Sequence, residues 1–374
     1  MKVLHFLWSG EVGGAERAVF QLVARQSRDP NLQVGVLFGR GSGPYHRRIA
    51  ELGVPVHALD LPGAGSPRTL TGGVPVMRRY DLHHFHALEP LAFAASLLAG
   101  RRTRVFTARA GVPSPPESGR KAARYRMGGL LLQRGFHGFS GNTRHATRAG
   151  AERFGIDPER FTTTYNGLDF SLLAANRTRS EVRRELGAGD GFVVGTAAIL
   201  KWWKRVDRLL EAAAAARIEG LRVVVLGDGP ELARLRARAD DLGLTGRVHF
   251  AGRLEDVADA VSAMDAFVLP SNDRESFGNA VVEAMALGVP SAVFADSPGI
   301  VEHVDDGRTG FVVRDVPELT AVLERLAAHP GLRARIGAAG SDAVRSKYTL
   351  EAMSQAYAEL YARASAHAGR TRAR

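Results

Sequence analysis

The chain has 374 residues and no cysteine, which excludes several classes of structure at once. A protein without thiols forms no disulfide and no cysteine-ligated zinc or iron–sulfur site. Long apolar runs are also missing, since the nearest to a transmembrane helix, residues 88–99, is too short. The apolar start at residues 1–8 is too short for a signal peptide and indicates a buried strand. We therefore expect a globular protein of the cytoplasm.

Two motifs typical of cofactor-dependent enzymes are missing as well. The turn Gly10-x-x-Gly13-Gly14-x-Glu16 is not the Gly-x-Gly-x-x-Gly dinucleotide fingerprint, which argues against a dehydrogenase. It is either a plain tight turn or a place where the backbone approaches a ligand at a helix start. The sequence also holds no Asp-x-Asp metal motif. We expect neither a metal nor a cofactor.

Acidic residues are outnumbered, because 39 Asp and Glu stand against 50 Lys and Arg. The net charge of +11 favours an anionic partner, whether a nucleotide, a membrane surface or a nucleic acid. A coding bias is the alternative, since arginine- and alanine-rich proteins are typical of genomes rich in G and C. Aromatic residues do not alternate with the basic ones, so we do not expect nucleic-acid binding.

The basic residues concentrate in one segment, residues 101–134, which has Glu117 as its single acidic residue. A helix over residues 121–134 would combine basic side chains with Leu130–Leu132. Such a helix can lie on an anionic membrane, so we predict peripheral membrane contact through residues 120–134. A solvated basic face or a site for an anionic acceptor explains the segment equally well.

Apolar strands alternate with amphipathic helices along the chain, in two series. The strands expected in the first series are residues 3–8, 32–38, 54–59, 81–86 and 104–107, and those in the second are 192–196, 222–226, 248–251, 267–270, 291–294 and an edge strand at 311–313. This alternation predicts an α/β fold of two doubly wound, Rossmann-like domains that face each other across a cleft. We place the domains at residues 1–170 and 171–349, a helix at 350–363 and a disordered basic tail at 364–374.

The most informative stretch is Glu275–Pro290, which follows an apolar strand ending at Pro270. Gly278 and Asn279 open a short apolar helix there, and a helix N-terminus favours a phosphate group. The two carboxylates, Glu275 and Glu283, would repel a phosphate and are better suited to accept hydrogen bonds from hydroxyl groups. Phosphate and hydroxyl groups together indicate a nucleotide sugar.

Other polar residues follow strands of the same series. Lys204 and Arg205 would neutralise a diphosphate or begin a solvated helix, and Trp202 would contact an acceptor or pack between domains. Gly227 and Asp228 form either an ordinary turn or part of the nucleotide site.

Polar groups also occur in two motifs of the first half of the chain, one at residues 165–169 and one at residues 83–86. Asn166, in Tyr165–Asp169, is either a turn residue or a ligand contact. In the first series, alternation places His83 on the opposite face of its strand from His84 and His86, so we expect His86 to face substrate rather than a metal.

With these motifs in order, the chain resembles the retaining glycosyltransferases of family 4, also known as glycosyl transferases group 1, which have the two-domain GT-B architecture. The resemblance extends over nearly the whole chain, residues 1–361. Its motifs are Gly-Gly-x-Glu at 13–16, Tyr-Asn-Gly-Leu-Asp at 165–169, Lys204, Gly-Asp-Gly-Pro at 227–230 and Glu-x7-Glu at 275–283, with further similarity at 298–302 and 306–311.

The resemblance implies a nucleotide-sugar site and a helix that crosses back to the first domain after residue 350. Glu275 would bind the donor sugar, Lys204 would neutralise the departing diphosphate, and Glu283 would hold the ribose. We take Glu275, Lys204 and His86 as catalytic. The expected donor-binding residues are Gly14, Lys204, Arg205, Gly227, Asp228, Ser276, Phe277, Gly278, Asn279 and Glu283.

The implied reaction moves a sugar, with UDP as the expected carrier, to a hydroxyl of a small molecule or glycan, without a metal and with retained configuration. The sequence departs from the family at Ile199, where the family has an arginine, so Arg205 or Lys201 would have to replace that charge. Arg109 stands where the family often has a histidine, and with Asn166 and Trp202 it is a candidate contact for the acceptor or donor sugar.

Two other functions stay open from the sequence. One is a nucleotide-sugar epimerase or phosphorylase of the same fold, and the other is a binding protein that has lost catalysis. The loops at residues 63–73 and 111–120 would choose the acceptor, whose identity the sequence does not reveal.

Overall fold

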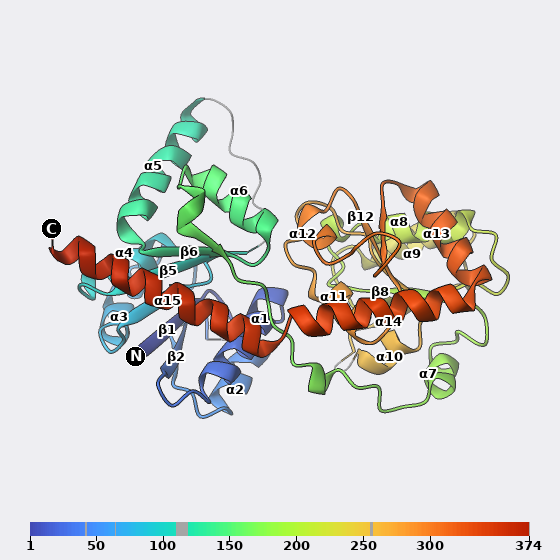
Figure 1. The fold of residues 1–374 in the computed structure, drawn as a ribbon, viewed down its shortest axis with the longest axis horizontal. Coiled ribbons are helices and arrows are strands. Elements are labelled where there is room, and N and C mark those ends of the chain that lie inside the picture. The colour runs from blue at the N-terminus through green and yellow to red at the C-terminus, as the bar shows by residue number, and fades with distance from the viewer. Residues whose placement is uncertain (42, 64, 110–118, 255–256, 374) are drawn as a thin grey trace. The chain divides into compact units, whose positions relative to one another are not determined.

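The computed structural model describes residues 1–41, 43–63, 65–109, 119–254 and 257–373, and only the backbone of residues 119–126 and 371–373. The chain divides into two compact units, Met1–Leu168 with Tyr348–Arg374, and Asp169–Lys347 (Figure 1). Nowhere in the described residues does a helix combine the length and hydropathy needed to cross a bilayer.

The first unit is built on a seven-stranded parallel sheet with the order β3-β2-β1-β4-β5-β6-β7. Its strands are β1 (Lys2–Leu7), β2 (Gln33–Phe38), β3 (Val56–Ala58), β4 (Leu82–Phe85), β5 (Thr103–Ala108), β6 (Gly138–Gly141) and β7 (Phe161–Thr163). Sequence patterns do not mark β6 and β7, because both are short and contain small or polar residues. The strand order reverses between β1 and β4, where an open parallel sheet leaves its binding crevice.

Helices cover both faces of this sheet, as a parallel sheet requires. They are α1 (Gly14–Gln26), α2 (Pro44–Ala50), α3 (Arg68–Met77), α4 (Pro90–Leu98), α5 (Gly119–Gly135), α6 (Arg144–Phe154) and α15 (Leu350–Ala373). The predicted loop at residues 63–73 is wrong in its second half, because α3 begins at Arg68. Thr69, Gly73 and Met77 recur every four residues and are buried on one side of α3, which packs against α4. The other predicted loop, 111–120, lies almost wholly outside the described residues.

The last helix, α15, packs against the first sheet, as predicted (Figure 1). Tyr357 and Tyr361 are buried with Val3 and Val105 of the strands. The prediction of a disordered tail from residue 364 is wrong, since the helix continues to Ala373. Ala364 and Ala368 lie one turn apart and are both buried, so the packing surface extends beyond the apolar tyrosine-rich part of the helix.

The second unit contains a six-stranded parallel sheet with the order β10-β9-β8-β11-β12-β13. Its strands are β8 (Val193–Ala197), β9 (Arg222–Leu226), β10 (Val248–Gly252), β11 (Ala266–Leu269), β12 (Ser291–Phe294) and β13 (Phe311–Val313). The helices are α7 (Arg179–Glu185), α8 (Val206–Ala215), α9 (Leu232–Asp241), α10 (Ala258–Ser262), α11 (Asn279–Ala286), α12 (Pro298–Val301), α13 (Val316–Ala328) and α14 (Pro330–Lys347). The edge position predicted for residues 311–313 is confirmed.

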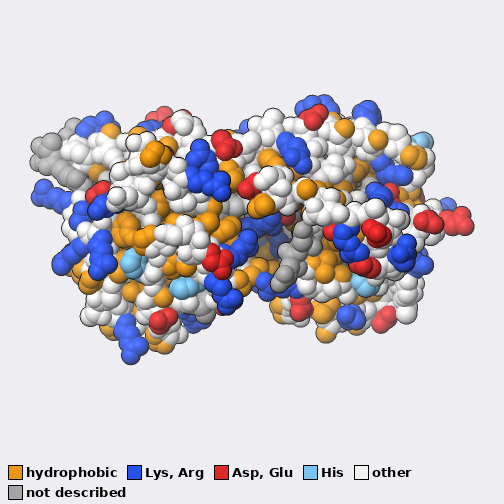
Figure 2. All heavy atoms as spheres, turned by 90° about the horizontal axis from the view of Figure 1, so that it is seen from below, with side chains coloured by type: hydrophobic (Ala, Val, Ile, Leu, Met, Phe, Trp, Pro, Cys, Tyr) orange, Lys and Arg blue, Asp and Glu red, His pale blue; other side chains and the backbone are white. Residues whose placement is uncertain are grey.

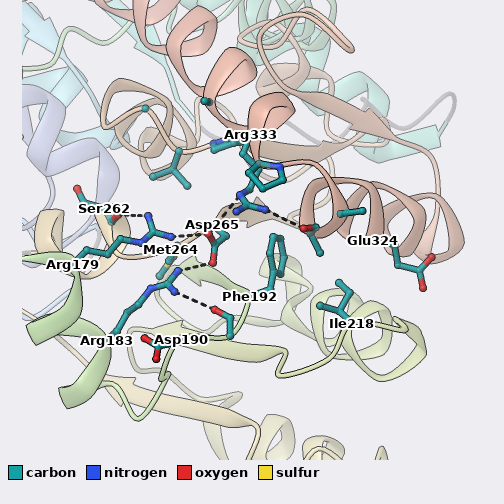
Figure 3. A pocket seen from close by; sticks show the side chains of 18 of the residues that line it. Arg179, Arg183, Asp190, Phe192, Ile218, Ser262, Met264, Asp265, Glu324 and Arg333 are labelled. Atoms are coloured by element: carbon teal, nitrogen blue, oxygen red, sulfur yellow. Dashed lines mark hydrogen bonds and ion pairs between the residues drawn. The ribbon is translucent and has the colours of Figure 1, made fainter.

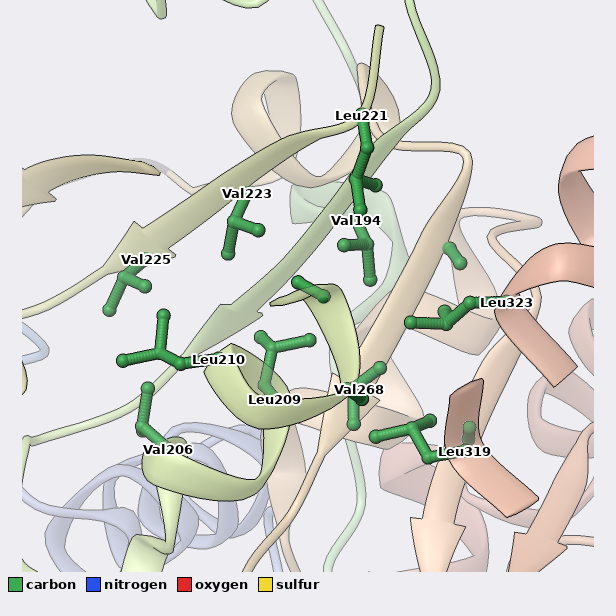
Figure 4. Close-up of a cluster of buried hydrophobic side chains, with 14 of the residues drawn as sticks. Val194, Val206, Leu209, Leu210, Leu221, Val223, Val225, Val268, Leu319 and Leu323 are labelled. Carbon is green, nitrogen blue, oxygen red and sulfur yellow. The ribbon is translucent and has the colours of Figure 1, made fainter. Parts of the chain in front are cut away.

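The core of this unit is formed by β-branched strand residues and leucines of the covering helices (Figure 4). Val206, Leu209 and Leu210 of α8 point toward the sheet, as their i, i+3, i+4 spacing predicts. Leu319 and Leu323 of α13 cover the neighbouring part of the same face. This packing holds the carboxyl ends of β8, β9, β11 and β12 in fixed positions.

Candidate functional site

The second sheet reverses its strand order between β8 and β11, and a parallel sheet of this kind binds ligands at that point. Lys204 follows β8 and Glu275 follows β11, so the two residues reach this point from opposite sides. Their ammonium and carboxylate groups form an ion pair, and each side chain is only 17% exposed. The Ser271 hydroxyl lies 3.5 Å from the same carboxylate oxygen. The structure thus brings together two residues that are 71 positions apart in the chain.

Backbone hydrogen bonds join the loops that follow the neighbouring strands. Leu200 N donates to Asp228 O over 2.9 Å, which connects the ends of β8 and β9. Asn272 N donates to Trp203 O over 3.0 Å, which connects the ends of β8 and β11. The predicted donor-binding residues of the second unit therefore lie along one edge of one sheet.

The N-terminus of α11 lies at this edge of the sheet, directly after the loop that carries Glu275. Gly278 precedes the helix with φ +66°, a left-handed conformation that favours glycine, and a Cβ there would lie 2.8 Å from Leu269 Cδ2. Asn279 begins the helix, and the buried Glu283 lies one turn later on the same side. The first backbone N–H groups of a helix have no intrahelical acceptor, so this position suits an anion.

His303 holds the loop in place and is a residue that sequence reasoning missed. Its Nε2 donates to the carbonyl oxygen of Phe277 over 2.6 Å, and the two rings lie 4.6 Å apart. Because a carbonyl only accepts, Nε2 must carry the proton. Burial lowers the pKa of His303 to about 4, although the bond to Phe277 opposes this, so the ring is neutral near pH 7. No sequence signal connects the two residues, which are 26 positions apart.

Other predicted residues contact protein groups instead of open space. Arg205 also adopts a left-handed conformation, with φ +49°, and its Nε lies 3.1 Å from the Asp207 carboxylate. The Asp228 carboxylate accepts from Gly229 N over 2.7 Å, so it stabilises its own turn. Gly227, which precedes it, has φ +122° and approaches Ala198 O so closely that a Cβ would lie 1.9 Å away.

Both cations expected to compensate for Ile199, Arg205 and Lys201, already contact other side chains of the protein. Ile199 is exposed, and the Lys201 ammonium lies 4.9 Å from the centre of the Trp203 ring. Trp202 is exposed, with the Arg274 guanidinium 4.9 Å above its ring. An exposed aromatic surface therefore lies next to Lys204, as expected for a contact with a flat or apolar ligand group.

Arg208, in the first turn of α8, is a further cation that the sequence analysis did not single out. Its guanidinium donates to Asp296 over 2.9 and 2.5 Å and to Pro270 O over 3.3 Å. Because Lys204 ends a 3-10 turn and Arg205 is left-handed, helical spacing from Lys204 gives no signal for Arg208, and only the folded structure identifies it.

In the first unit, a chain of histidines lies at the strand-order reversal, where β4 ends. Gln26 Oε1 only accepts, so His5 Nε2, 2.8 Å away, carries the proton of His5. His5 Nδ1 then accepts from His86 Nε2 over 2.9 Å. His86 Nδ1 is therefore an acceptor, and it is buried without a hydrogen-bond partner among the described residues. Burial, with smaller effects of His84 and Arg109, holds the pKa of His86 well below its usual range.

The neighbouring histidines separate as alternation predicted. His83 bonds to Ser96 and Met77, whereas His84 bonds to Tyr361 and Thr107 on the other face. Ring nitrogens of His5, His84 and His86 lie within 4.8 Å of one another, as in a metal site. Four hydrogen bonds engage all of these ring nitrogens except His86 Nδ1, and the rings of His84 and His86 are 3.9 Å apart, so the arrangement is that of a hydrogen-bonded network.

Arg109 follows β5 and is half-buried next to this network. It donates to Asn166 Oδ1 over 3.2 Å and to the Tyr357 hydroxyl over 3.4 Å, and its Nε has no partner in the described chain. The candidates Arg109 and Asn166 are thus brought together. Gly14, predicted to approach phosphates, is exposed at the first position of α1, directly after the Gly13 N-cap.

The basic helix α5 exposes an apolar stripe. Met127, Leu130 and Leu131 are 63%, 56% and 59% exposed, and their spacing of i, i+3 and i+4 places them on one side. Leu132 is buried instead, and Arg134 is exposed one turn further along. The basic side chains predicted at residues 120–126 lie outside the described side chains.

Two family models match the chain. The model of glycosyltransferase family 4 matches residues 12–172, and that of glycosyl transferases group 1 matches residues 178–342. Together they cover most of the chain, and the boundary between them falls near the boundary between the two units.

Individual proteins are similar over shorter or more divergent stretches. The lipopolysaccharide core biosynthesis glycosyltransferase LpsE of Rhizobium meliloti is 35% identical over 151 residues, 40% of this chain and 44% of that protein. An alpha-D-kanosaminyltransferase of Streptomyces kanamyceticus is 31% identical over 49% of this chain and 48% of that protein. The chain thus matches about half, or less, of the length of these relatives.

The solved structure of Anabaena Alr3699/HepE in complex with UDP has a TM-score of 0.83 and 24% identity, covering 96% of this chain and 99% of that one. This likeness confirms the predicted GT-B fold class with its Rossmann-like sheets. The two family matches, in the predicted order along the two sheets, show that the chain belongs to the family 4, group 1 glycosyltransferases.

Proposed function

We propose that the protein is a retaining hexosyltransferase that moves a sugar from a nucleoside diphosphate sugar to a hydroxyl of a small molecule or glycan. The observation that carries this proposal is the Lys204–Glu275 pair, which precedes the N-terminus of α11. A cation and a helix N-terminus suit a diphosphate, while a carboxylate suits sugar hydroxyl groups. UDP is the carrier we propose, because the similar Anabaena structure is a complex with UDP.

The free enzyme holds Lys204 on Glu275, and donor binding would exchange these partners. The ammonium would turn to the diphosphate and the carboxylate would accept from the sugar. The bond between C1 and the diphosphate oxygen then breaks, and its electron pair stays on the diphosphate. The acceptor oxygen bonds to C1 from the same side, and its proton passes to the departing diphosphate oxygen. Lys204 and the helix dipole would stabilise that charge in place of a metal ion.

The first unit would contribute recognition of a hydroxyl and of an anion. His86 Nδ1 is a buried acceptor whose lone pair is directed by the bond from His86 Nε2 to His5, so it suits a sugar hydroxyl. Arg109 supplies a half-buried cation beside it, which suits an anionic donor sugar or acceptor. Gln26 would act through His5 by fixing the tautomer of His86.

The stripe Met127–Leu131 on α5 would insert into a membrane surface, with Arg134 on anionic headgroups. Sedimentation with vesicles, with and without anionic phospholipid, tests this contact. We expect Leu130→Ser with Leu131→Ser to abolish vesicle binding, and Leu172→Ser, an equally exposed residue of the second unit, to leave it unchanged. Equal vesicle binding by the parent protein and both variants would contradict the proposed membrane contact.

The enzymatic proposal is tested with purified protein and a panel of nucleotide sugars. Lys204→Ala should lower turnover by about 10²–10³, as removal of one group that stabilises developing charge does. The exposed Lys2→Ala serves as the control of equal charge change, and a chelator should leave the rate unchanged. Near-normal turnover by Lys204→Ala would contradict the site, and release of sugar without any acceptor, or a rate that depends on phosphate, would favour the epimerase or phosphorylase of the same fold.

A further inference from the structure

A hollow of about 910 Å³ lies at the opposite edge of the second sheet, at the amino ends of the strands (Figure 3). Phe192 precedes β8, Asp265 precedes β11 and Pro290 precedes β12, and all three line it. The Lys204–Glu275 pair, in contrast, follows the carboxyl ends of these strands. The hollow is therefore distinct from the proposed donor site, and its volume is typical of a site for a small molecule.

Three guanidinium groups converge on one carboxylate in this hollow (Figure 3). Asp265 is buried, and its two oxygens lie 2.7 Å from Arg179, 2.5 Å from Arg183 and 3.6 Å from Arg333. Val193 N also donates to Asp265, over 2.8 Å. One carboxylate balances one guanidinium, so two positive charges remain uncompensated within this cluster.

Four other charged residues line the hollow, and they are Asp190, Arg217, Glu219 and Glu324. Asp190, Arg217 and Glu219 are exposed, so water screens their charges. Glu324 is half-buried and accepts from Arg217 N over 2.8 Å. Within the cluster, the Arg183 and Arg333 side chains are 11% and 24% exposed, whereas Arg179 is 47% exposed, so an anion would gain most from the side of Arg333.

Two of the three arginines keep N–H groups for a ligand. A guanidinium has five N–H groups. Arg333 uses Nη1 on Leu326 O and Ala327 O, while its Nε is too far from Asp265 for a hydrogen bond. Arg179 donates one bond from each Nη, to Ser262 O and Asp265. In the described chain, these bonds leave Nε and at least one further N–H of each residue for an anion.

The wall beside the arginines is apolar. Phe192, Ile218 and Met264 line it, and the Arg333 guanidinium lies 5.7 Å from the centre of the Phe192 ring. A bare inorganic anion would leave this wall uncovered, whereas an organic phosphate would cover it. We propose that the hollow binds a small phosphorylated metabolite with at least two negative charges, held by Arg179 and Arg333.

The same arginines also connect α7 and α14 to the start of β11, so a purely structural role has to be distinguished. Calorimetric titration of the full chain with glucose 6-phosphate and with pyrophosphate distinguishes a ligand-binding role of these arginines from a structural one. Titrations are made in the Lys204→Ala background, because pyrophosphate would also bind at the donor site. A structural role predicts no heat of binding in this background, and that result would overturn the proposal.

Paired variants locate the site. Arg179→Gln with Arg333→Gln should weaken binding by about a hundredfold, since each lost charge-assisted bond costs about tenfold. The matched control is Arg184→Gln with Arg335→Gln, which changes exposed arginines of the same two helices and should bind like the parent. Equal affinity of the two double variants would also overturn the proposal. If the first double variant does not fold, Arg179→Gln alone, 47% exposed, gives the same comparison with about a tenfold loss.

Discussion

Replacing Glu275 by glutamine should change product binding and turnover in opposite directions. In the free protein the Lys204 ammonium is held by the Glu275 carboxylate. A diphosphate has to separate this pair and then remain near the negative charge that it leaves behind. The neutral, isosteric glutamine side chain removes that competition while it keeps the size of the residue. We therefore expect Glu275→Gln to bind UDP more tightly than the parent.

The size of the effect follows from Coulomb's law. Two unit charges about 6 Å apart repel each other by about 3 kcal/mol at an effective dielectric constant near 20. Both side chains are 17% exposed, so water and salt reduce this repulsion further. A remaining gain of about 1.4 kcal/mol corresponds to a tenfold tighter UDP complex. Turnover of the nucleotide sugar should fall about a hundredfold or more, because the carboxylate that accepts from the sugar is lost.

Calorimetry with UDP and a coupled assay of UDP release measure the two quantities on the same sample. Asp273→Asn is the matched control, since it removes an exposed carboxylate from the same loop and changes the net charge equally. It should alter UDP affinity only slightly. Weaker UDP binding by Glu275→Gln than by Asp273→Asn would refute the reasoning, because it would mean that the carboxylate helps to hold the diphosphate.

Three further outcomes follow from local geometry. Gly278→Ala should destabilise the second unit by more than Gly288→Ala in urea unfolding. Both glycines are left-handed, so both variants lose about 1–2 kcal/mol to backbone strain, but only the Gly278 Cβ meets another atom, Leu269 Cδ2. Equal unfolding midpoints of the two variants would contradict this. Burial lowers the pKa of His303 to about 4, so the contribution of the neutral ring to stability is present above pH 6.5 and is lost as the pH falls toward 4. His303→Gln should therefore flatten the loss of stability between pH 7 and 5, and an unchanged slope of stability against pH would argue against this role. Ala364→Asp should lower the melting temperature of the first unit, whereas Ala366→Asp, at an exposed position of the same helix, should not, and equal melting would restore the idea of a loose tail.

Several features follow from local sequence alone. The two parallel sheets are determined by the period of apolar residues and by the spacing between strands, which are both local properties. Strands β9 and β12 begin and end at the predicted residues, because each is a run of β-branched or apolar residues next to turn residues. The helix start at Gly278–Asn279 was equally visible, since a glycine after a strand and loop is a local signal.

Other features depend on contacts between residues distant in sequence, which no local pattern contains. The extension of α15 to Ala373 depends on the sheet surface that buries Ala364 and Ala368, not on the helix itself. Helix α3 likewise replaces the second half of a predicted loop, because it packs against α4 and buries Thr69, Gly73 and Met77.

The chemical state of the site residues also came only from the tertiary structure. The sequence identified Lys204, Glu275 and His86 by type, but the pairing of the first two and the tautomer of the third depend on neighbours brought from other strands. Residue type and spacing determine which groups are available to a site. Burial and hydrogen-bond partners decide their charge and direction, because both depend on atoms that only folding brings within a few ångströms.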